Sequence, residues 1–229
     1  MKILAIEFSS AQRSVALLEG SPPIRGGSAD LNVAACVTET GLGKTRAMPK
    51  IESALNEAGW DRGQIDTLVV GLGPGSYTGI RAGISLAQGW QLARSVNIQG
   101  SSSMECLAVR AHAAGWRERT HFVLDAQRGE FYRAAYDFDD HVPECCVPLG
   151  LVSRETVQAV LDGGGRVAGP EITKWFPGGF EFFPDAITLG LMAAREPVII
   201  SGEKLEPIYL RPVTFVKAPT PRHIPTGMR

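Results

Sequence analysis

A glycine-rich turn between a predicted buried strand and a predicted helix constrains this chain more than any other feature. The strand is expected over Ile65–Val70, the turn reads GLGPGSYTG over Gly71–Gly79, and the helix follows over about Ile80–Arg94. Backbone N–H groups at such a turn, beside a helix N-terminus, can hold an anion. No Lys-Ser or Lys-Thr pair follows the last glycine, so the turn is not a Walker loop. The sequence therefore predicts an α/β lobe with a tight connection from strand to helix.

A stripe of small residues runs along the predicted helix after this turn. Gly79, Gly83 and Ala87 recur at every fourth position, and Leu86 and Trp90 flank them. A glycine inside a helix costs about 1 kcal/mol relative to alanine, so a close contact is expected to compensate for the two glycines. Two interpretations of this close contact remain open. The stripe packs on the sheet of its own lobe, or a helix of another molecule packs on it.

Both halves of the chain show a similar order of predicted elements. Lys2–Ile6 and Ser14–Leu18 form a predicted hairpin, Leu31–Thr38 a third strand, and Thr45–Ala58 a helix with apolar residues three and four positions apart. In the second half, helices are predicted over Met104–Ala114, Leu151–Leu161 and Thr188–Arg195. Strands are predicted over Phe122–Asp125, Gly129–Asp137 and Arg166–Ala168. We expect two α/β lobes, over residues 1–100 and 101–211, and the last segment of the second lobe can pack on the first lobe. A proline-rich basic tail is expected over residues 212–229.

Composition and charge exclude several classes of protein. The chain has 229 residues, of which 44% are hydrophobic and 21% charged, so it is not disordered as a whole. Its formal charge of −1 leaves no broad cationic surface for a nucleic acid backbone, so any nucleic acid is expected on a partner. No apolar run reaches the roughly 18 residues of a membrane span, and Glu7 comes too early for a signal peptide. A cytoplasmic protein without membrane contact is expected.

The patterns of cysteine, histidine and serine do not indicate metal or nucleophilic catalysis. The four cysteines form no CxxC pair, and the four histidines lie far apart in the sequence. The chain also contains no GxSxG motif, the usual position of a nucleophilic serine in α/β hydrolases. We expect reduced thiols, no metal site and no catalytic serine.

Four segments together resemble the TsaB (YeaZ) family, the bacterial partners of TsaD in the synthesis of threonylcarbamoyladenosine in tRNA. They are the N-terminal MKILAIEFSS with SVALLEG after it, the motif GPGSYTGIRAGISLAQG, the later LDAQRGEFY and the closing LEPIYLR. The family's glycine motif falls on Gly73, Pro74, Gly75, Ser76, Thr78, Gly79 and Arg81. The resemblance covers residues 1–211 and implies an actin/Hsp70-like α/β fold, with two RNase H-like lobes whose mixed sheets are flanked by helices. It also implies membership of the Gcp-like group, once classed as M22 glycoproteases.

The resemblance further implies that the chain is not an enzyme. The catalytic relative TsaD holds a metal through two histidines, and the matching positions here are Ser103 and Leu107. A hydroxyl group is a poor ligand for such a metal and leucine is none, so no metal and no cofactor are expected. Proteins of this fold bind phosphate at the loop after the first strand, where this chain has glutamate instead of the usual aspartate. The residues interpreted as remains of a phosphate site are Glu7, Ser9, Ser10 and Asp125.

The expected function is that of a non-catalytic subunit, which binds and activates a TsaD-like catalytic subunit for modification of adenosine 37. The resemblance places the contact on the helices over Thr45–Ala58 and Ile80–Arg94. The residues expected there are Met48, Ile51, Leu55, Gly79, Gly83, Leu86, Ala87 and Trp90. The same surface is expected to form a homodimer when the partner is absent. A TsaE-like ATPase supplies ATP hydrolysis, and tRNA is expected to involve this chain only indirectly.

Two other functions remain open from the sequence. The first is an independent ATP-binding kinase or ATPase of the same fold, which would need a working loop at Glu7–Ser9, Asp125 and a glycine turn near Gly169 together. The second is a metallopeptidase of the M22 type, which would need about one tightly bound metal ion per chain. Binding of Mg-ATP by the isolated chain would favour the first, and metal analysis tests the second.

Overall fold

The first lobe is built on a five-stranded mixed sheet, and a computed structural model describes residues 1–21, 30–41, 46–139, 142–195 and 198–211. Strands β1 (Lys2–Glu7), β2 (Gln12–Ser21) and β3 (Asp30–Thr40) are antiparallel. Strands β4 (Thr67–Gly71) and β5 (Asn97–Ser101) continue the sheet from β1 in parallel. The strand order is therefore β3-β2-β1-β4-β5.

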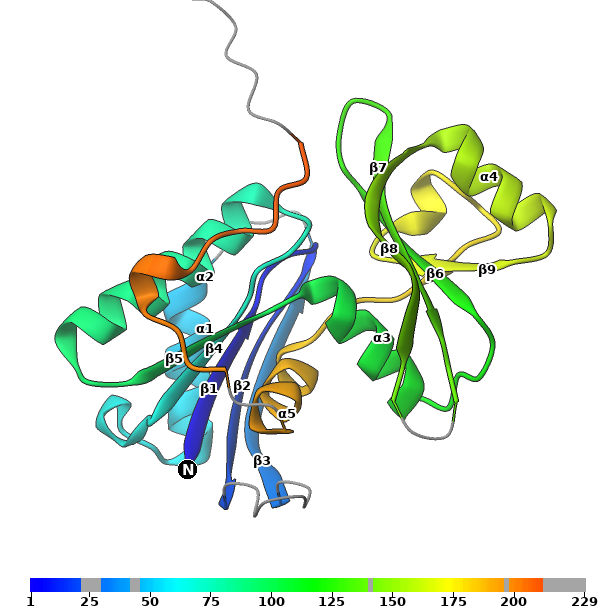
Figure 1. Cartoon of the computed structure of the whole chain (residues 1–229). Coiled ribbons are helices and arrows are strands. Elements are labelled where there is room, and N and C mark those ends of the chain that lie inside the picture. The colour runs from blue at the N-terminus through cyan, green and yellow to red at the C-terminus, as the bar shows by residue number, and fades with distance from the viewer. Residues whose placement is uncertain (22–29, 42–45, 140–141, 196–197, 212–229) are drawn as a thin grey trace, which may run out of the picture.

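The second sheet repeats this topology strand for strand. Its members are β6 (Thr120–Asp125), β7 (Glu130–Asp137), β8 (Glu144–Ser153), β9 (Arg166–Gly169) and β10 (Phe180–Glu181). The order is β10-β9-β6-β7-β8, with β6, β7 and β8 antiparallel and β9 and β10 parallel to β6. Figure 1 shows the two sheets in separate lobes. This repeat of a mixed sheet with helices on its faces is the expected actin/Hsp70-like fold of two RNase H-like lobes.

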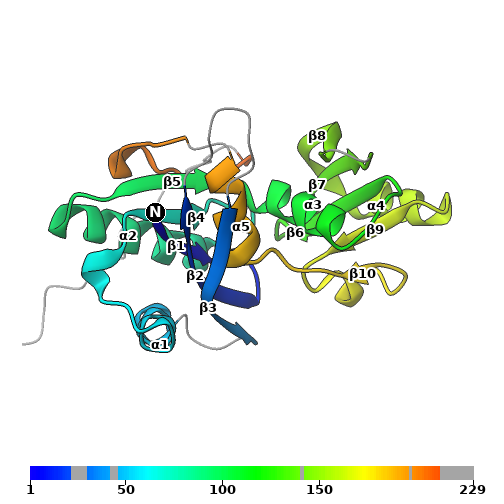
Figure 2. The same cartoon turned by 90° about the horizontal axis from the view of Figure 1, so that it is seen from below.

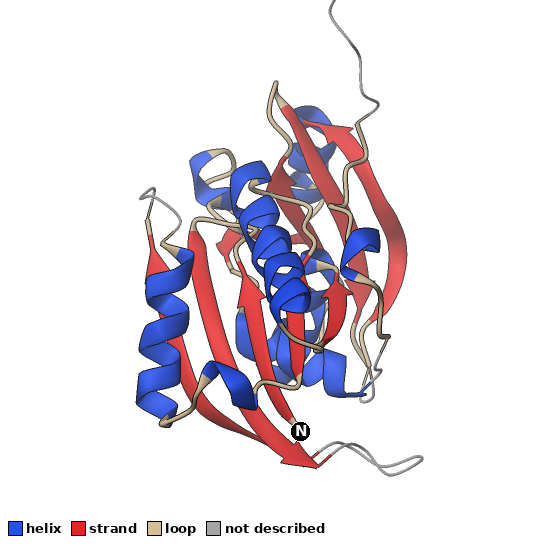
Figure 3. Ribbon diagram, turned by 90° about the vertical axis from the view of Figure 1, so that its left-hand side faces the viewer, coloured by secondary structure: helices blue, strands red, loops and turns tan. Residues whose placement is uncertain are grey.

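Helices cover both faces of the first sheet, because each central strand alternates apolar side chains between the two faces. Helices α1 (Ala47–Ala58) and α2 (Tyr77–Ala93) pack on the face that carries Leu4 and Ile6. Helix α5 (Ala186–Arg195) packs on the opposite face, which carries Ile3 and Ala5. Figure 2 shows α1 and α5 on opposite sides of the sheet, and Figure 3 shows α1 and α2 over one face. After the second lobe, α5 thus returns to the first lobe.

The two lobes meet at helix α3 (Ser103–Ala113), which directly follows β5. Leu107 and Ala108 of this helix belong to the core of the second lobe, whereas Cys106 packs with α5 on the first sheet. The other face of the second sheet is covered by α4 (Arg154–Asp162) and by a short 3-10 helix, η2 (Ile172–Lys174). Helix α3 therefore contacts the cores of both lobes (Figure 1).

Most predicted elements are observed, but one prediction in the second lobe is wrong at its start. The helix expected over Leu151–Leu161 begins only at Arg154, because Leu151 still pairs with Tyr132 in the sheet. Ser153 then caps the helix by accepting a hydrogen bond from the backbone of Thr156. Strands β5, β8 and β10 were not predicted. The start of the helix predicted from residue 45 and the basic tail over residues 212–229 lie outside the described residues.

Candidate functional site

The small-residue stripe of α2 packs inside its own lobe. A Cβ atom on Gly79 would lie 2.0 Å from the carbonyl oxygen of Phe8, and one on Gly83 would lie 3.1 Å from a methyl group of Val70. Ala87 is fully buried in the same core. The internal contact is thus the one observed, with Phe8, Ile6 and Val70 as the neighbours of the two glycines, and contact of Gly79, Gly83 and Ala87 with a partner stays a prediction.

The other residues expected at a partner surface divide into two groups. Ile51 and Leu55 of α1 are buried in the first-lobe core. Met48 of α1 and Leu86 and Trp90 of α2 are only partly buried and pack on the edge of that core. Of the residues expected at the partner surface, Met48, Leu86 and Trp90 therefore provide the accessible apolar surface of these two helices.

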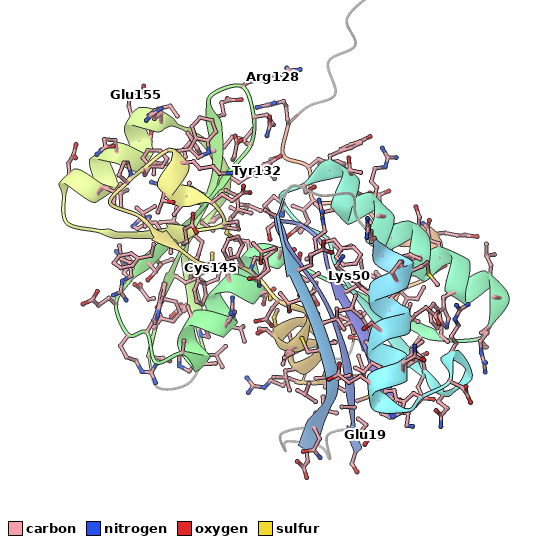
Figure 4. All side chains as sticks on the ribbon, turned by 180° about the vertical axis from the view of Figure 1, so that it is seen from behind. Glu19, Lys50, Arg128, Tyr132, Cys145 and Glu155 are labelled. Carbon is pink, nitrogen blue, oxygen red and sulfur yellow. The ribbon has the colours of Figure 1, made fainter. Side chains whose placement is uncertain are left out.

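Helix α1 is tied to the sheet by an unusual ion pair. Lys50, labelled in Figure 4, is buried on the side of α1 that faces β3, and its ammonium group bonds the carboxylate of Glu39. The ammonium group holds the pKa of Glu39 below its usual value. At the other end, Gly59 ends α1 in the left-handed conformation with φ 66°. The ion pair therefore attaches the N-terminal part of α1 to β3, and Gly59 marks the end of the helix.

The glycine motif forms the entrance to α2. Gly73 and Gly75 have φ of 88° and 145°, and the peptide bond between Gly73 and Pro74 is cis. Ser76 caps α2, since its side chain accepts a hydrogen bond from the backbone of Gly79 at 3.3 Å. At Gly75 a side chain would collide with the backbone of Ser9. The motif therefore serves close packing of the turn on the β1–β2 loop.

Two other members of the motif are exposed. Arg81 bonds the hydroxyl group of Tyr77, and its guanidinium group lies 4.9 Å from the centre of that ring. Thr78 is exposed and lines a cleft between the lobes. The glycines and Pro74 thus shape the turn, whereas Arg81 and Thr78 present polar groups to solvent.

Glu7 is fully buried at the end of β1, and its carboxylate is held inside the protein. Oε1 accepts a hydrogen bond from the backbone of Ser9 at 2.6 Å, and Oε2 accepts one from the hydroxyl group of Ser103 at 2.8 Å. The same hydroxyl group accepts a bond from the backbone of Gly73 at 3.2 Å. Burial raises the pKa of Glu7, and the hydrogen bonds from Ser9 and Ser103 oppose part of that rise. Glu7 therefore links β1, the glycine turn and α3.

A cleft of about 530 Å³ separates the lobes beyond this network. The first lobe contributes Ser9, Ser10 and the N-terminus of α2, and the second lobe contributes Asp125 among others. Tyr132 lines it as well and lies on the side of the second lobe that faces the first (Figure 4). Three of the four residues interpreted as remains of a phosphate site thus lie at one cleft, whereas Glu7 does not line it.

The carboxylate of Asp125 accepts hydrogen bonds from the turn that follows it. One of its carboxylate oxygens accepts a hydrogen bond from the backbone of Gln127 at 2.7 Å, and the other accepts one from the side chain of Gln127 at 3.0 Å. Gln127, Arg128 and Gly129 all have positive φ, between 61° and 78°. An aspartate that bonds the backbone two residues ahead is the usual way to stabilise such a turn. The observed role of Asp125 is to shape the β6–β7 connection.

Sequence reasoning missed two aromatic residues at the cleft. The rings of Tyr77 and Tyr209 stack with a centroid distance of 5.6 Å, and both line the cleft. Tyr209 belongs to the LEPIYLR segment, which the sequence analysis treated only as a family signature. Nothing in the spacing of the two tyrosines indicates that they meet, because 132 positions separate them in the sequence.

Ser103 and Leu107, where the resemblance places the metal-binding histidines of TsaD, are buried parts of the fold. Ser103 bonds Glu7, and Leu107 is fully buried in the core of the second lobe. Within the described ranges, no group of three or more histidine, cysteine, aspartate or glutamate side chains could hold a metal ion. The helices of the described segments include none that is both long and apolar enough to cross a membrane.

Comparison with known proteins gives the family. The family model described as "TsaD: tRNA N6-adenosine threonylcarbamoyltransferase" matches residues 44–211. The chain belongs to this TsaD-type family. Within it, relatives named tRNA threonylcarbamoyladenosine biosynthesis protein TsaB place the chain in the TsaB (YeaZ) branch, as the resemblance predicted.

Two TsaB relatives match over nearly their whole length. The chain is 28% identical to TsaB of Escherichia coli over 92% of this chain and 95% of the relative. It is 29% identical to TsaB of Haemophilus influenzae over 96% of this chain and 98% of the relative. The solved structure of YeaZ from Pseudomonas aeruginosa superposes with a TM-score of 0.72, at 25% identity, over 91% of this chain and 99% of YeaZ. This TsaB-family chain therefore shares the complete two-lobed fold with YeaZ.

Proposed function

We propose that this TsaB-family chain is a non-catalytic subunit that binds and activates a TsaD-type threonylcarbamoyltransferase in the modification of adenosine 37 of tRNA. The observation that supports it most is the use of Ser103 and Leu107, where TsaD has histidines, as buried parts of the fold. The names of the TsaB relatives support the assignment to threonylcarbamoyladenosine biosynthesis. The reaction takes place on the partner, with a TsaE-like ATPase in the same assembly. Such a complex acts on tRNA in the cytoplasm.

The partner surface in this proposal is the outer face of α1 and α2. Met48, Leu86 and Trp90 offer partly exposed apolar side chains above the first-lobe core. A helix pair of the partner covers them, which removes apolar surface from water at about 25 cal/mol per Å². Without the partner, two copies of this chain pair through the same face. Because the net formal charge of the chain is −1, it has no broad cationic surface for a nucleic acid backbone, and tRNA contacts belong to the other subunits.

Co-expression with the cognate TsaD-type subunit, followed by size-exclusion chromatography, tests the proposal. The two proteins should elute together, and Met48→Glu or Leu86→Glu should abolish the complex while the melting temperature stays within a few degrees. Val142→Glu is the matched control, because Val142 is an apolar residue of the second lobe, outside the proposed surface, and is 60% exposed. A complex that survives Met48→Glu and Leu86→Glu together would contradict the proposed surface.

The second candidate is an ATP-binding protein of the same fold, and the interlobe cleft is the observation that favours it. Two sets of hydrogen bonds argue against it. Glu7 bonds Ser9 and Ser103, and Asp125 bonds Gln127, so neither carboxylate is directed at a ligand. Isothermal titration with Mg-ATP separates the two functions. Micromolar binding and ATP hydrolysis by the chain alone would support the kinase or ATPase, and threonylcarbamoyladenosine formation without the partner would contradict a non-catalytic subunit.

A further inference from the structure

The C-terminal segment over residues 201–211, here called the strap, runs from the edge of the first sheet to the second lobe. Just before it, Ile200 pairs with Ile98 of β5. The strap begins with a short 3-10 helix, η3 (Gly202–Lys204), which packs on α2. Figure 1 shows the strap in orange along α2, with its end near the tip of the second lobe.

The first part of the strap is firmly attached to the first lobe. The backbone of Gly202 donates a hydrogen bond to the side chain of Gln91 at 2.9 Å and accepts one from Gln88 at 3.0 Å. Leu205 is buried in the first-lobe core. The backbone of Ile208 donates a hydrogen bond to the carbonyl group of Leu72 at 2.9 Å. The strap is thus part of the first lobe as far as Ile208.

The last residue of the strap contacts the other lobe. The guanidinium group of Arg211 donates a hydrogen bond to the carbonyl group of Gln127 at 3.2 Å and forms an ion pair with the carboxylate of Glu130. Gln127 belongs to the β6–β7 connection, whose tip carries Arg128 (Figure 4), and Glu130 is the first residue of β7. Between these two attachments, Tyr209 stacks on Tyr77 and lines the interlobe cleft. The strap therefore spans the cleft from one lobe to the other.

The remaining chain connections between the lobes lie together at α3. One is Ser102–Ser103, between β5 and α3, and the other is Asp185, just before α5. Cys106 of α3 donates a hydrogen bond to the carbonyl group of Asp185 at 3.4 Å, and Arg110 forms an ion pair with the Asp185 carboxylate at 2.7 Å. Because these two chain connections are bonded to each other, they form a single hinge axis about which the lobes can rotate.

We infer that Arg211 is a latch, which ties the strap to the β6–β7 connection and fixes the angle between the lobes around the axis at α3. Both partners of the ion pair are partly exposed, and exposed ion pairs stabilise only weakly. The latch is therefore reversible. Its release leaves each lobe folded, since Ile208 and the residues before it keep their contacts with the first lobe, and it widens the cleft.

Distance measurements on the full-length chain test this inference. Spin labels are placed at the exposed positions Glu57 of α1 and Glu155 of α4 by a method that does not use the native cysteines. Wild type, diluted with unlabelled chain so that pairing of two copies adds no distance, should give one narrow distance distribution between the lobes. Arg211→Ala should broaden it toward longer distances and raise the hydrogen-exchange rates of the amides in the β6–β7 connection by about fivefold. The matched control is Lys204→Ala, which also removes one positive charge from the strap and should leave the distribution unchanged.

A charge exchange distinguishes the latch from a general loss of stability. Arg211→Glu should widen the distribution, and the double variant with Glu130→Arg should restore the narrow wild-type form. Circular dichroism should show the same helix content in all variants. An unchanged distribution in Arg211→Ala, a change of equal size in Lys204→Ala, or failure of the double variant to restore the narrow distribution would each overturn the inference.

Discussion

The hydroxyl group of Ser103 donates a 2.8 Å hydrogen bond to the carboxylate of Glu7, and both side chains are fully buried. Ninety-six positions separate the two residues in the sequence, and the bond joins the end of β1 to the start of α3. Here each residue satisfies the other, so the pair stabilises the junction of the lobes.

This pair predicts a dependence of stability on pH that belongs to Glu7. Because burial raises its folded-state pKa above the ordinary value of 4.5, the folded chain holds the proton more tightly than the unfolded chain. The corresponding stability is fully present below the ordinary pKa and is lost as the pH rises through the raised pKa. Glu7→Gln, which keeps the acceptor for Ser9, should remove this loss. Differential scanning calorimetry should then show that the melting temperature of the variant rises relative to that of wild type as the pH increases above 4.5. Melting temperatures that depend on pH in the same way in both proteins would contradict the prediction.

Removal of the carboxylate should be more harmful than its neutralisation. Glu7→Ala leaves the buried backbone N–H of Ser9 and the hydroxyl group of Ser103 without an acceptor. An unsatisfied buried polar group costs about 1–3 kcal/mol, so urea unfolding should show a loss of about 2 kcal/mol or more. Glu7→Gln at the same pH is the control. Equal stability of the two variants would mean that the bonds contribute nothing.

The glycines of α2 should respond oppositely to the same substitution. In Gly79→Ala the new methyl group meets the carbonyl oxygen of Phe8, which is backbone and cannot give way easily. A loss of about 1–3 kcal/mol from overpacking is expected. Gly89→Ala, on the same helix, meets no atom within 4 Å and should stabilise the protein by up to about 1 kcal/mol. Thermal unfolding of both variants checks this, and a stabilising Gly79→Ala would contradict the observed packing.

Phe8 should behave as a core residue although it lies in the loop interpreted as the remains of a phosphate site. Its ring is buried in the first-lobe core with Ile80 and Val15. Phe8→Ala should cost about 3–5 kcal/mol in urea unfolding, and Phe8→Leu should cost less because it retains more apolar volume. If both variants unfold like wild type, the ring contributes no packing energy.

The thiol groups should differ sharply in reactivity. Cys106 is fully buried and its pKa is raised well above the ordinary value by burial, whereas Cys145 is exposed on the edge strand β8. Iodoacetamide at neutral pH should therefore modify Cys145 first and Cys106 only after unfolding. Peptide mass spectrometry over time gives the order. Early modification of Cys106 in the folded protein would contradict the packing of α3 on α5.

The sequence predicted the elements whose signal is local, and failed where the partner of a residue is remote. Periodicity located α1 and the strands of the first hairpin, and Gly59 correctly marked the end of α1. The helical spacing of Gly79 and Gly83 showed that something lies close, but only the sheet order shows that it is the backbone of Phe8. The bond between Glu7 and Ser103 has no local signal, because each residue alone suits a turn or a helix start.

The second lobe repeats the sheet of the first but not its helices. Between β4 and β5 the first lobe has α2, with 17 residues, whereas between β9 and β10 the second lobe has only η2, with 3. Among the described residues, two long helices lie together on one sheet face only in the first lobe. In the proposed assembly the chain therefore offers one such helix pair, and a copy or a relative that covers it forms a closed pair rather than a filament.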